Sequence, residues 1–590
     1  MSRKVRLGSR HSRRRFVQTS GAVGLTLAAS ARGDLAVAQS ATPEDSAQSP
    51  YYEDTEGPPQ PGGDVRFLLY EDPNSLNPIL GSTSIAIQVV AAIQEGLTRN
   101  DPDGTFVPLL AAELPTQENG GVSEDLLTVT WTLKEGVTWS DGEPFTSADV
   151  LFTWEAARDA ANGSTVVSDY QLVTDVQAPD PLTVVVTYSD FNAGYLDQFP
   201  WILPVHATGD VADMRNWAFN RAPIGTGPFK LDEWSSGQFL DLSPNENYRE
   251  EGKPYLDGLI FLVVPDESVR TAMMIEESAE IMLWSGQAAD EQIAAAGVGA
   301  SRTAPGIWVV EIHFNLSQPF DDDPGVDPPH PILGNVRVRE AITLGVNRDR
   351  ITQELITGTV FELDSPLDVG WLDCQVEPFS YDPEAAMALL DEAGWRDEDG
   401  DGIREAHGIE TVEDGTPLSL MMNGYTGFDT LDLIELAVQE DLLTIGVDVQ
   451  IENQELAVIF GTWEDGSPRM IGDYDLLIYD SGFFAEPGAD IANQYAPDQV
   501  PNADNPGGEN IYRWVRDDVG EWITAANSSP DIEVRRENFC NVAMALREDV
   551  VTFPILQFSE GSAYSNRLHG FAVSTWEWAT WDAANWWLEE

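Results

Sequence analysis

The sequence predicts an α/β fold, because strand-like and helix-like segments alternate along most of the chain. Strand-like segments carry apolar residues at every second position, and helix-like segments show the 3.6-residue period. Such interleaving is typical of α/β proteins. The chain has 590 residues, of which 42% are hydrophobic, so it is long and apolar enough to form several domains with buried cores.

The ordered part of the chain is expected to begin near Gly62. Residues 65–69 alternate as in a strand, and residues 85–97 then have the period of a helix. A second strand is predicted over residues 129–133. These elements set the pattern of strand followed by helix that the rest of the chain continues.

Capping residues mark the expected helix boundaries. Thr146 and Asp149 have the spacing of a capping box, which predicts a helix over residues 148–161. In the second half, the Asp-Pro pair at 382–383 supplies an N-cap and a proline at the first helical position. A helix over 385–393 should therefore begin there and end at a left-handed glycine. A longer helix over 430–444 and a strand over 447–451 follow.

The composition excludes several classes of function. With 32 Lys and Arg against 99 Asp and Glu, the chain has a formal charge of −67, so nucleic acids and anionic membrane surfaces would repel it. Two Cys and six scattered His supply neither a multi-thiolate metal centre nor an H-E-x-x-H motif. No G-x-S-x-G motif occurs, so a secreted hydrolase is kept only as an alternative supported by the many acidic residues.

The first 38 residues have the features of an export signal. They contain eight basic residues and one acid, and residues 12–18 (SRRRFVQ) resemble a twin-arginine motif. An uncharged run follows that is too short to span a bilayer, and residues 36–38 offer an A-x-A cleavage site. A plain basic tail is the alternative. Residues 39–61 are expected to form a flexible leader, and removal of residues 1–38 would leave a charge of −74.

Short motifs lie in order along residues 62–590. The most specific is LKEGVTWSDGEPFTSADV at residues 133–150. Others are DPNSLNP at 72–78, PIGTGPFKL at 223–231, VRVREAI at 336–342 and LLDEAGW at 389–395. In this order they resemble the family 5 solute-binding proteins of ABC transporters, the group of oligopeptide- and dipeptide-binding proteins.

The resemblance implies a two-lobed periplasmic-binding-protein fold (type II, cluster C) with an extra domain inserted in lobe I, and lobes that close on a ligand at a hinge. It implies an exported, non-catalytic monomer, periplasmic or extracellular, that delivers a peptide or similarly sized solute to the permease subunits of an ABC importer. An oligosaccharide-binding member and a sensory binding protein are alternatives. The expected boundaries are lobe I at 62–97, the inserted domain at 98–220, lobe I again at 221–313, lobe II at 314–548 and lobe I at 549–590.

By the same resemblance, the ligand site in lobe II lies within residues 475–487. The family's Gly-Trp pair is missing here, and Phe483 or Phe484 stands where the family has an Asp that holds a peptide's α-amino group. Asp480 or Glu486 is the candidate to replace it, because a buried ammonium needs a paired carboxylate. Otherwise the two Phe rings suit a neutral sugar or apolar ligand, or they pack in the core of the lobe. The candidate contacts are Tyr479, Asp480, Ser481, Phe483, Phe484 and Glu486.

Two further groups of residues are candidates for the lobe I side. Tyr70, Glu71 and Asp72 follow the first strand and should approach the cleft, although a solvated acidic turn is an equal alternative. Five Trp residues crowd residues 576–587. Their density suggests stacking on a sugar, but packing in the core of lobe I is the favoured interpretation.

Residues 397–408 have carboxylates at positions 1, 3 and 5 and glycine at position 6, as EF-hand-type calcium loops do. Position 12 is Gly408 instead of a bidentate Glu, so an ordinary acidic turn is the favoured alternative to a structural calcium ion. No other cofactor is expected. The candidate calcium ligands are Asp397, Asp399, Asp401, Ile403 and Glu405.

Two further local patterns are the pair of cysteines and a Gly-Thr-Gly sequence. Cys374 and Cys540 both fall in the expected lobe II, where an exported protein meets oxidising conditions, so a disulfide and two buried thiols are both open. The Gly-Thr-Gly at residues 225–227 lacks the G-K-[ST] of a nucleotide loop, and a structural turn is predicted there.

Overall fold

The structure, a computed structural model, describes residues 58–80, 83–317, 328–356, 360–368, 370–372, 374–483 and 485–589. The predicted export signal, most of the predicted leader and Phe484 lie outside the described residues. Everything below concerns the described part of the chain.

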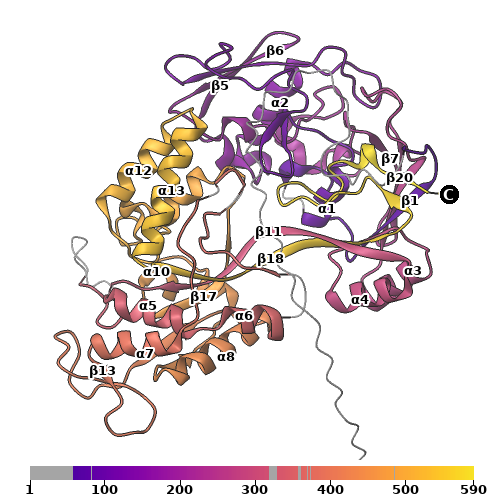
Figure 1. The fold of residues 1–590 in the computed structure, drawn as a ribbon. Helices are drawn as coiled ribbons and strands as arrows, with labels where there is room; N and C mark the ends of the chain where they lie inside the picture. Colours follow the sequence, from indigo (N-terminus) through magenta and orange to yellow (C-terminus); the bar gives the residue numbers. More distant parts are fainter. Residues whose placement is uncertain are drawn as a thin grey trace, which may run out of the picture. The chain divides into compact units, whose positions relative to one another are not determined.

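The largest sheet has eleven strands and mixes parallel with antiparallel neighbours (Figure 1). Its order is β16-β15-β17-β11-β18-β10-β1-β9-β8-β7, and the short β12 also pairs with β18. The strands are β1 (Asp64–Leu69), β7 (Phe229–Ser235), β8 (Phe239–Pro244), β9 (Gly258–Val263), β10 (Ile281–Leu283), β11 (Gly299–Phe314), β12 (Val360–Phe361), β15 (Ser419–Asn423), β16 (Asp448–Ile451), β17 (Leu476–Gly482) and β18 (Thr552–Ser565).

Two long antiparallel strands, β11 and β18, join the two halves of this sheet (Figure 1). One end of β18 pairs with β10 in the first half, and the opposite end of β11 pairs with β17 in the second half. Their register breaks in the middle, where Pro305 pairs with Ser559 and Val309 already pairs with Gln557. Residues 306–308 of β11 therefore form a bulge at the point where both strands pass from one half to the other.

The first half of the sheet carries α1 (Ser84–Val90), α3 (Glu267–Ile275) and α4 (Gln287–Ala296). A second, distinct core lies over residues 79–219 and contains the buried Trp131 and Trp139. It is built on the three-stranded sheet β4-β6-β5 and on α2, with β4 at Thr128–Thr132, β5 at Val173–Asp180, β6 at Thr183–Tyr188 and α2 at Ser147–Ala157. This core covers most of the predicted inserted domain, whose exact boundaries stay a prediction.

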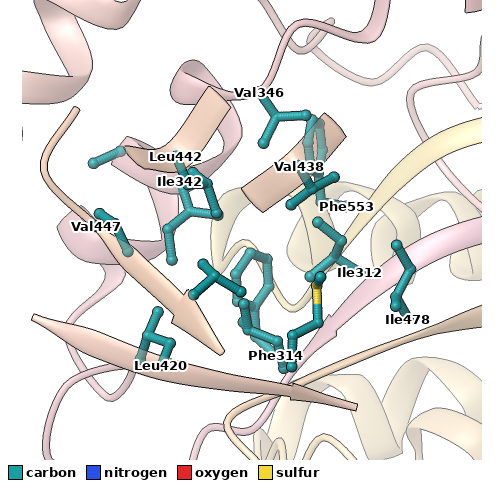
Figure 2. Close-up of a cluster of buried hydrophobic side chains, with 14 of the residues drawn as sticks. Ile312, Phe314, Ile342, Val346, Leu420, Val438, Leu442, Val447, Ile478 and Phe553 are labelled. Carbon is teal, nitrogen blue, oxygen red and sulfur yellow. The ribbon is translucent and has the colours of Figure 1, made fainter. Parts of the chain in front are cut away.

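The second half of the sheet is covered by α5 (Val336–Gly345), α7 (Pro383–Glu392) and α8 (Asp429–Thr444). Figure 2 shows the core between these helices and the strands, where Ile312 and Phe314 of β11 meet Ile342 and Leu442. A further cluster includes residues of α10 (Pro468–Ile471), α11 (Gly488–Tyr495), α12 (Asp517–Asn527) and α13 (Ile532–Glu548).

Most of the predicted elements are confirmed, and capping explains why. Asp382 accepts the N–H of Ala385 at 2.9 Å at the start of α7, and Gly394 follows with φ of 93°. Asp149 accepts the N–H of Thr146 at 2.9 Å at the start of α2, which ends at Ala157, before the predicted residue 161.

The predicted helix over residues 85–97 is wrong in its second half. Helix α1 ends at Val90, and the carbonyls of Ala92 and Ile93 accept the N–H groups of Phe229 and Gly227. A distant segment therefore takes the hydrogen-bonding groups that would have continued the helix, so its local period misled the prediction.

Candidate functional site

A cavity of about 550 Å3 lies beside the bulge of β11. It is lined from the first half by residues within 94–100, 197–201 and 573–585, from β11 by Ile307 and Trp308, and from the second half by Ala485. Its volume falls in the range of sites that enclose small solutes. The cavity is therefore bounded mainly by the first half and by the strands that connect the two halves, and Ala485, just after β17, is its lining residue from the second half.

A second cavity of about 300 Å3 lies on the other side of the bulge, against the second half of the sheet. Trp308 lines both cavities, and 45% of its surface is exposed. The smaller cavity is also lined by Tyr479, Asp480 and Ser481 of β17. The two cavities form the two sides of one candidate cleft that meets at Trp308.

Three of the predicted lobe II residues therefore lie at the cleft. Asp480 accepts the hydroxyl of Tyr425 at 2.6 Å, and Ser481 donates its hydroxyl to the buried carboxylate of Glu311 in β11. Burial raises the pKa of Tyr479 to about 12, so its hydroxyl stays protonated. Asp480 and Ser481 are half-buried and can offer a ligand a carboxylate oxygen and a hydroxyl oxygen, whereas Tyr479 is only 6% exposed.

The predictions for Phe483 and Glu486 need correction. Phe483 is only 1% exposed and packs with its ring centroid 6.4 Å from that of Tyr495, so it belongs to the core, as the sequence-based alternative held. Both carboxylate oxygens of Glu486 accept hydrogen bonds from the guanidinium of Arg535. Glu486 is thus already neutralised by a protein cation and does not stand free for a ligand's ammonium.

The lobe I residues predicted after the first strand do not line either cavity. Tyr70 packs against Trp284, which does line the larger cavity, with 5.9 Å between ring centroids. Asp72 accepts the indole N–H of Trp234 at 3.1 Å, and Glu71 is exposed. The wall on this side comes instead from residues within 94–100 and 197–201 and from the C-terminal segment.

The Trp residues near the C-terminus divide between two roles. Trp586 and Trp587 are buried in the core, as predicted. Trp576, Trp578 and Trp581 are half-buried and line the larger cavity, and Trp578 also packs against the core of the first half, as predicted, while Trp576 packs against a core cluster of the second half. The density of Trp in this segment was the available signal. Sequence spacing could not separate the two groups, because the segment has little regular secondary structure.

The sequence matches the family of bacterial extracellular solute-binding proteins, family 5, over residues 105–500. The chain belongs to this family. It is 28% identical to the oligopeptide-binding protein AppA of Bacillus subtilis over 414 residues, which are 68% of this chain and 71% of AppA. It is 27% identical to the nickel-binding periplasmic protein of Escherichia coli over 386 residues, which are 64% and 69% of the two chains.

Solved structures agree on the two-lobed fold. HbpA2 from Haemophilus parasuis superposes with a TM-score of 0.74 at 16% identity, covering 90% of this chain and 100% of HbpA2. The predicted two-lobed α/β fold is thus confirmed. Within the described residues of this solute-binding protein, we find no helix that is both long and apolar enough to cross a membrane.

One wall of the solute-binding protein's cavity is held by a buried ion pair. Glu95 accepts from the guanidinium of Arg249 at 2.6 Å and from the hydroxyl of Thr226 at 2.8 Å. Thr226 belongs to the predicted structural turn. A Cβ at the neighbouring Gly225 would lie 1.7 Å from the carbonyl oxygen of Ile93, so only glycine fits this approach.

Three carboxyl groups at the larger cavity have raised pKa values. Burial raises the pKa of Glu577 to about 7, and the nearby Asp197 adds to this shift while Arg99 opposes it. Desolvation by the surrounding protein also raises the pKa of Asp197 to about 7, with Glu486 and Asp169 adding repulsion, while part of this residue remains exposed. Burial raises the pKa of Glu560 as well, and the hydrogen bond from the indole N–H of Trp284 opposes this rise.

The candidate calcium loop brings four carboxylates together. Ligand oxygens of Asp397, Asp399, Asp401 and Glu405 all lie within 4.8 Å of one another. The same carboxylates accept backbone N–H groups of the loop, such as that of Gly400 on Asp397 at 2.7 Å. The geometry is common to calcium loops and to plain acidic turns, so calcium binding stays a prediction.

Cys374 and Cys540 form a disulfide, which resolves the two alternatives left open by the sequence. It ties the segment at residue 374 to α13. In the same segment, Trp371 donates its indole N–H to the carbonyl of Ala485 at 2.9 Å, and the backbone carbonyl of Trp371 accepts from the guanidinium of Arg536 at 2.8 Å. The disulfide thus supports the part of the second half that reaches the larger cavity.

Proposed function

We propose that this protein captures a peptide or a similarly sized solute in the cleft around Trp308 and delivers it to the permease of an ABC importer, without catalysing a reaction. The observation that carries the proposal is the cavity of about 550 Å3, because it lies against the strands that join the two halves and is lined by the first half and by Ala485 of the second. A solute held there would favour the conformation in which both halves contact it.

The known relatives support a solute of this kind. One is named an oligopeptide-binding protein, and several others are named peptide-binding proteins of ABC transporters. We propose a periplasmic or extracellular location reached by the twin-arginine route, and a monomeric state. Support for this route comes from the signal-like residues 1–38, and support for the location comes from the extracellular family.

An oligosaccharide is the second candidate ligand. The faces of Trp576, Trp578 and Trp581 at the larger cavity favour it, because sugar rings stack on flat apolar surfaces. A role as a sensory binding protein would use the same cleft and differ only in the membrane partner.

Purified protein should first be examined by native mass spectrometry for a bound solute, and then by thermal shift with blocked and free di- to pentapeptides and with oligosaccharides. A ligand at 100 times its Kd should stabilise the fold by about 2.7 kcal/mol. Trp308→Ala should reduce this gain.

The matched control is Trp522→Ala, because Trp522 is partly buried on α12 and lines neither cavity. It should leave the ligand-induced shift unchanged. If no peptide or oligosaccharide raised Tm and no solute copurified, the proposed ligand class would be wrong.

A further inference from the structure

Three acidic side chains at the larger cavity stand outside the ion pairs formed by the described residues. Asp197, Glu560 and Glu577 line the cavity, and in the described part of the chain none of them forms an ion pair with Arg, Lys or His. Two other acids of the lining differ in this respect. Glu95 is paired with Arg249 at 2.6 Å, and Glu250 is paired with Lys253 at 2.9 Å.

Glu560 and Glu577 accept hydrogen bonds from neutral donors, and Arg99 of the same lining attracts Glu577 without forming an ion pair with it. Glu560 accepts the indole N–H of Trp284 at 2.7 Å, and Glu577 accepts the backbone N–H of Asn100 at 2.6 Å. Asp197 faces the further acids Glu486 and Asp169. Glu560 and Glu577 are half-buried, and Asp197 is exposed at the same lining. A carboxylate that is partly removed from water is stabilised by a nearby cation, so this arrangement favours positive charge that arrives with a ligand.

Two buried amide oxygens of the same lining lack a hydrogen-bond donor. Gln94 is 1% exposed and Asn100 is 9% exposed, and neither the Oε1 of the first nor the Oδ1 of the second has a partner. The Nε2 of Gln94 donates to the carbonyl of Leu76 at 3.1 Å, which fixes which end of that amide remains unpaired. An unsatisfied buried acceptor costs free energy that a ligand N–H would recover.

Aromatic faces complete this surface. The larger cavity is lined by Trp201, Trp284, Trp308, Trp576, Trp578 and Trp581. The guanidinium of Arg99 already lies 5.1 Å from the ring centroid of Trp581, so a cation is compatible with these rings. Indole faces attract cations through their quadrupole, and the attraction grows when water is excluded.

We propose that the solute carries a cationic group with N–H donors, an ammonium or a guanidinium, which binds at Asp197, Glu560 and Glu577. The carboxylates supply the opposite charge, the orphan oxygens of Gln94 and Asn100 accept N–H groups, and the Trp faces cover the cation. N–H groups distinguish this ligand from a quaternary ammonium. This inference rests on the proposed function and names the chemistry of its solute.

The same chemistry can come from a free guanidine or amine or from a basic side chain of a peptide, and the experiment has one arm for each source. The first probe is N-acetyl-argininamide, and the second is the blocked tripeptide Ac-Ala-Arg-Ala-NH2. Each is compared by calorimetry with its citrulline twin, which has the same shape and a neutral urea in place of the guanidinium. We expect at least one arginine probe to bind about 10-fold or more tightly than its twin.

Variants of the cavity carboxylates test whether these residues cause the preference for arginine over citrulline. Glu577→Gln and Asp197→Asn should each reduce the preference for arginine over citrulline by about 10-fold, and both should fold because they remove an uncompensated charge. Glu118→Gln, an exposed acid outside both cavities, should leave the preference unchanged.

Equal binding of arginine and citrulline probes would overturn the inference, as would binding of neither. Unchanged preference in both cavity variants would do the same. If neutral peptides or oligosaccharides still raised Tm in any of these cases, the proposed function would remain supported, and only the inference of a cationic ligand would be wrong.

Discussion

Glu311 is a fully buried carboxyl group in the middle strand of the molecule. It lies on β11 opposite Tyr479 of β17, and the hydroxyls of Ser481 and Thr552 donate to its two oxygens. Burial raises its pKa from the ordinary value of 4.5 to about 7, and the two hydroxyls oppose the shift. The folded protein therefore binds this proton more tightly than the unfolded chain does.

The pH dependence of stability follows from this shift. The contribution of Glu311 to the free energy of unfolding is fully present below about pH 4.5, and it is lost as pH rises from there to about 7. The loss amounts to about 3 kcal/mol. Glu311→Gln removes the titrating group, so the free energy of unfolding of the wild type, minus that of the variant, should fall by this amount between pH 4.5 and 8 in urea titrations. Parallel curves for the two proteins would contradict the prediction, and Glu118→Gln serves as control.

Glu486 shows how a predicted ligand group acts as a structural one. Its pair with Arg535 is buried, and Arg535 also lies 5.1 Å from the ring centroid of Trp371. Glu486→Gln should destabilise the protein by about 3 kcal/mol, because it leaves a buried guanidinium without its counter-charge. Glu533→Gln breaks the exposed pair with Arg536 on α13 and should cost less than about 0.5 kcal/mol. Equal urea midpoints for the two variants would count against this role.

At the scale of elements, the disulfide joins α13 to a segment 166 residues earlier in the chain. Closing a loop of this length restricts the unfolded chain strongly, so replacing both Cys374 and Cys540 by Ser should cost about 4 kcal/mol. The wild type in dithiothreitol should match the double variant in guanidinium titrations. Oxidised and reduced protein with the same midpoint would show that the disulfide adds no stability.

The acidic loop over residues 397–405 allows a sharp test of its two interpretations. If calcium binds, titration calorimetry should show heat, and calcium should raise Tm by mass action. Asp399→Asn should abolish both effects, because it removes one of four clustered carboxylates. No heat and no change of Tm on chelation would leave the loop as an acidic turn.

The elements that the sequence predicted well are those whose ends depend on nearby residues. Asp382 and Gly394 bound α7 through contacts within a few residues, so local chemistry suffices. The end of α1 depends on Gly227 and Phe229, which lie more than 130 residues away in the sequence, so no local pattern predicts where this helix ends. The same limit explains the cavity. Trp576 and Trp586 look alike in sequence, and only the folded chain places one at the cleft and the other in the core.

At the scale of the whole molecule, the charge of −67 is spread along the chain. Repulsion among exposed carboxylates destabilises the compact state, and salt screens it. We expect Tm to rise with NaCl, with most of the gain between about 0.01 and 0.5 M, since the Debye length shortens from about 30 Å to a few ångströms over that range. Such screening would make the acidic surface suited to a salty medium, which is the interpretation that we favour. A constant Tm would contradict it, and a gain only above 1 M would indicate exclusion of salt from the protein surface instead.

The bulge at residues 306–308 gives the protein an optical property. Trp308 stands on the strand that both halves share, and its partly exposed indole borders both cavities. The emission of an indole depends on its contact with water, so a solute that covers Trp308 shifts its fluorescence while it draws the halves together. Other Trp residues also line the larger cavity, so the part of the shift that is lost in Trp308→Phe is the part that Trp308 reports.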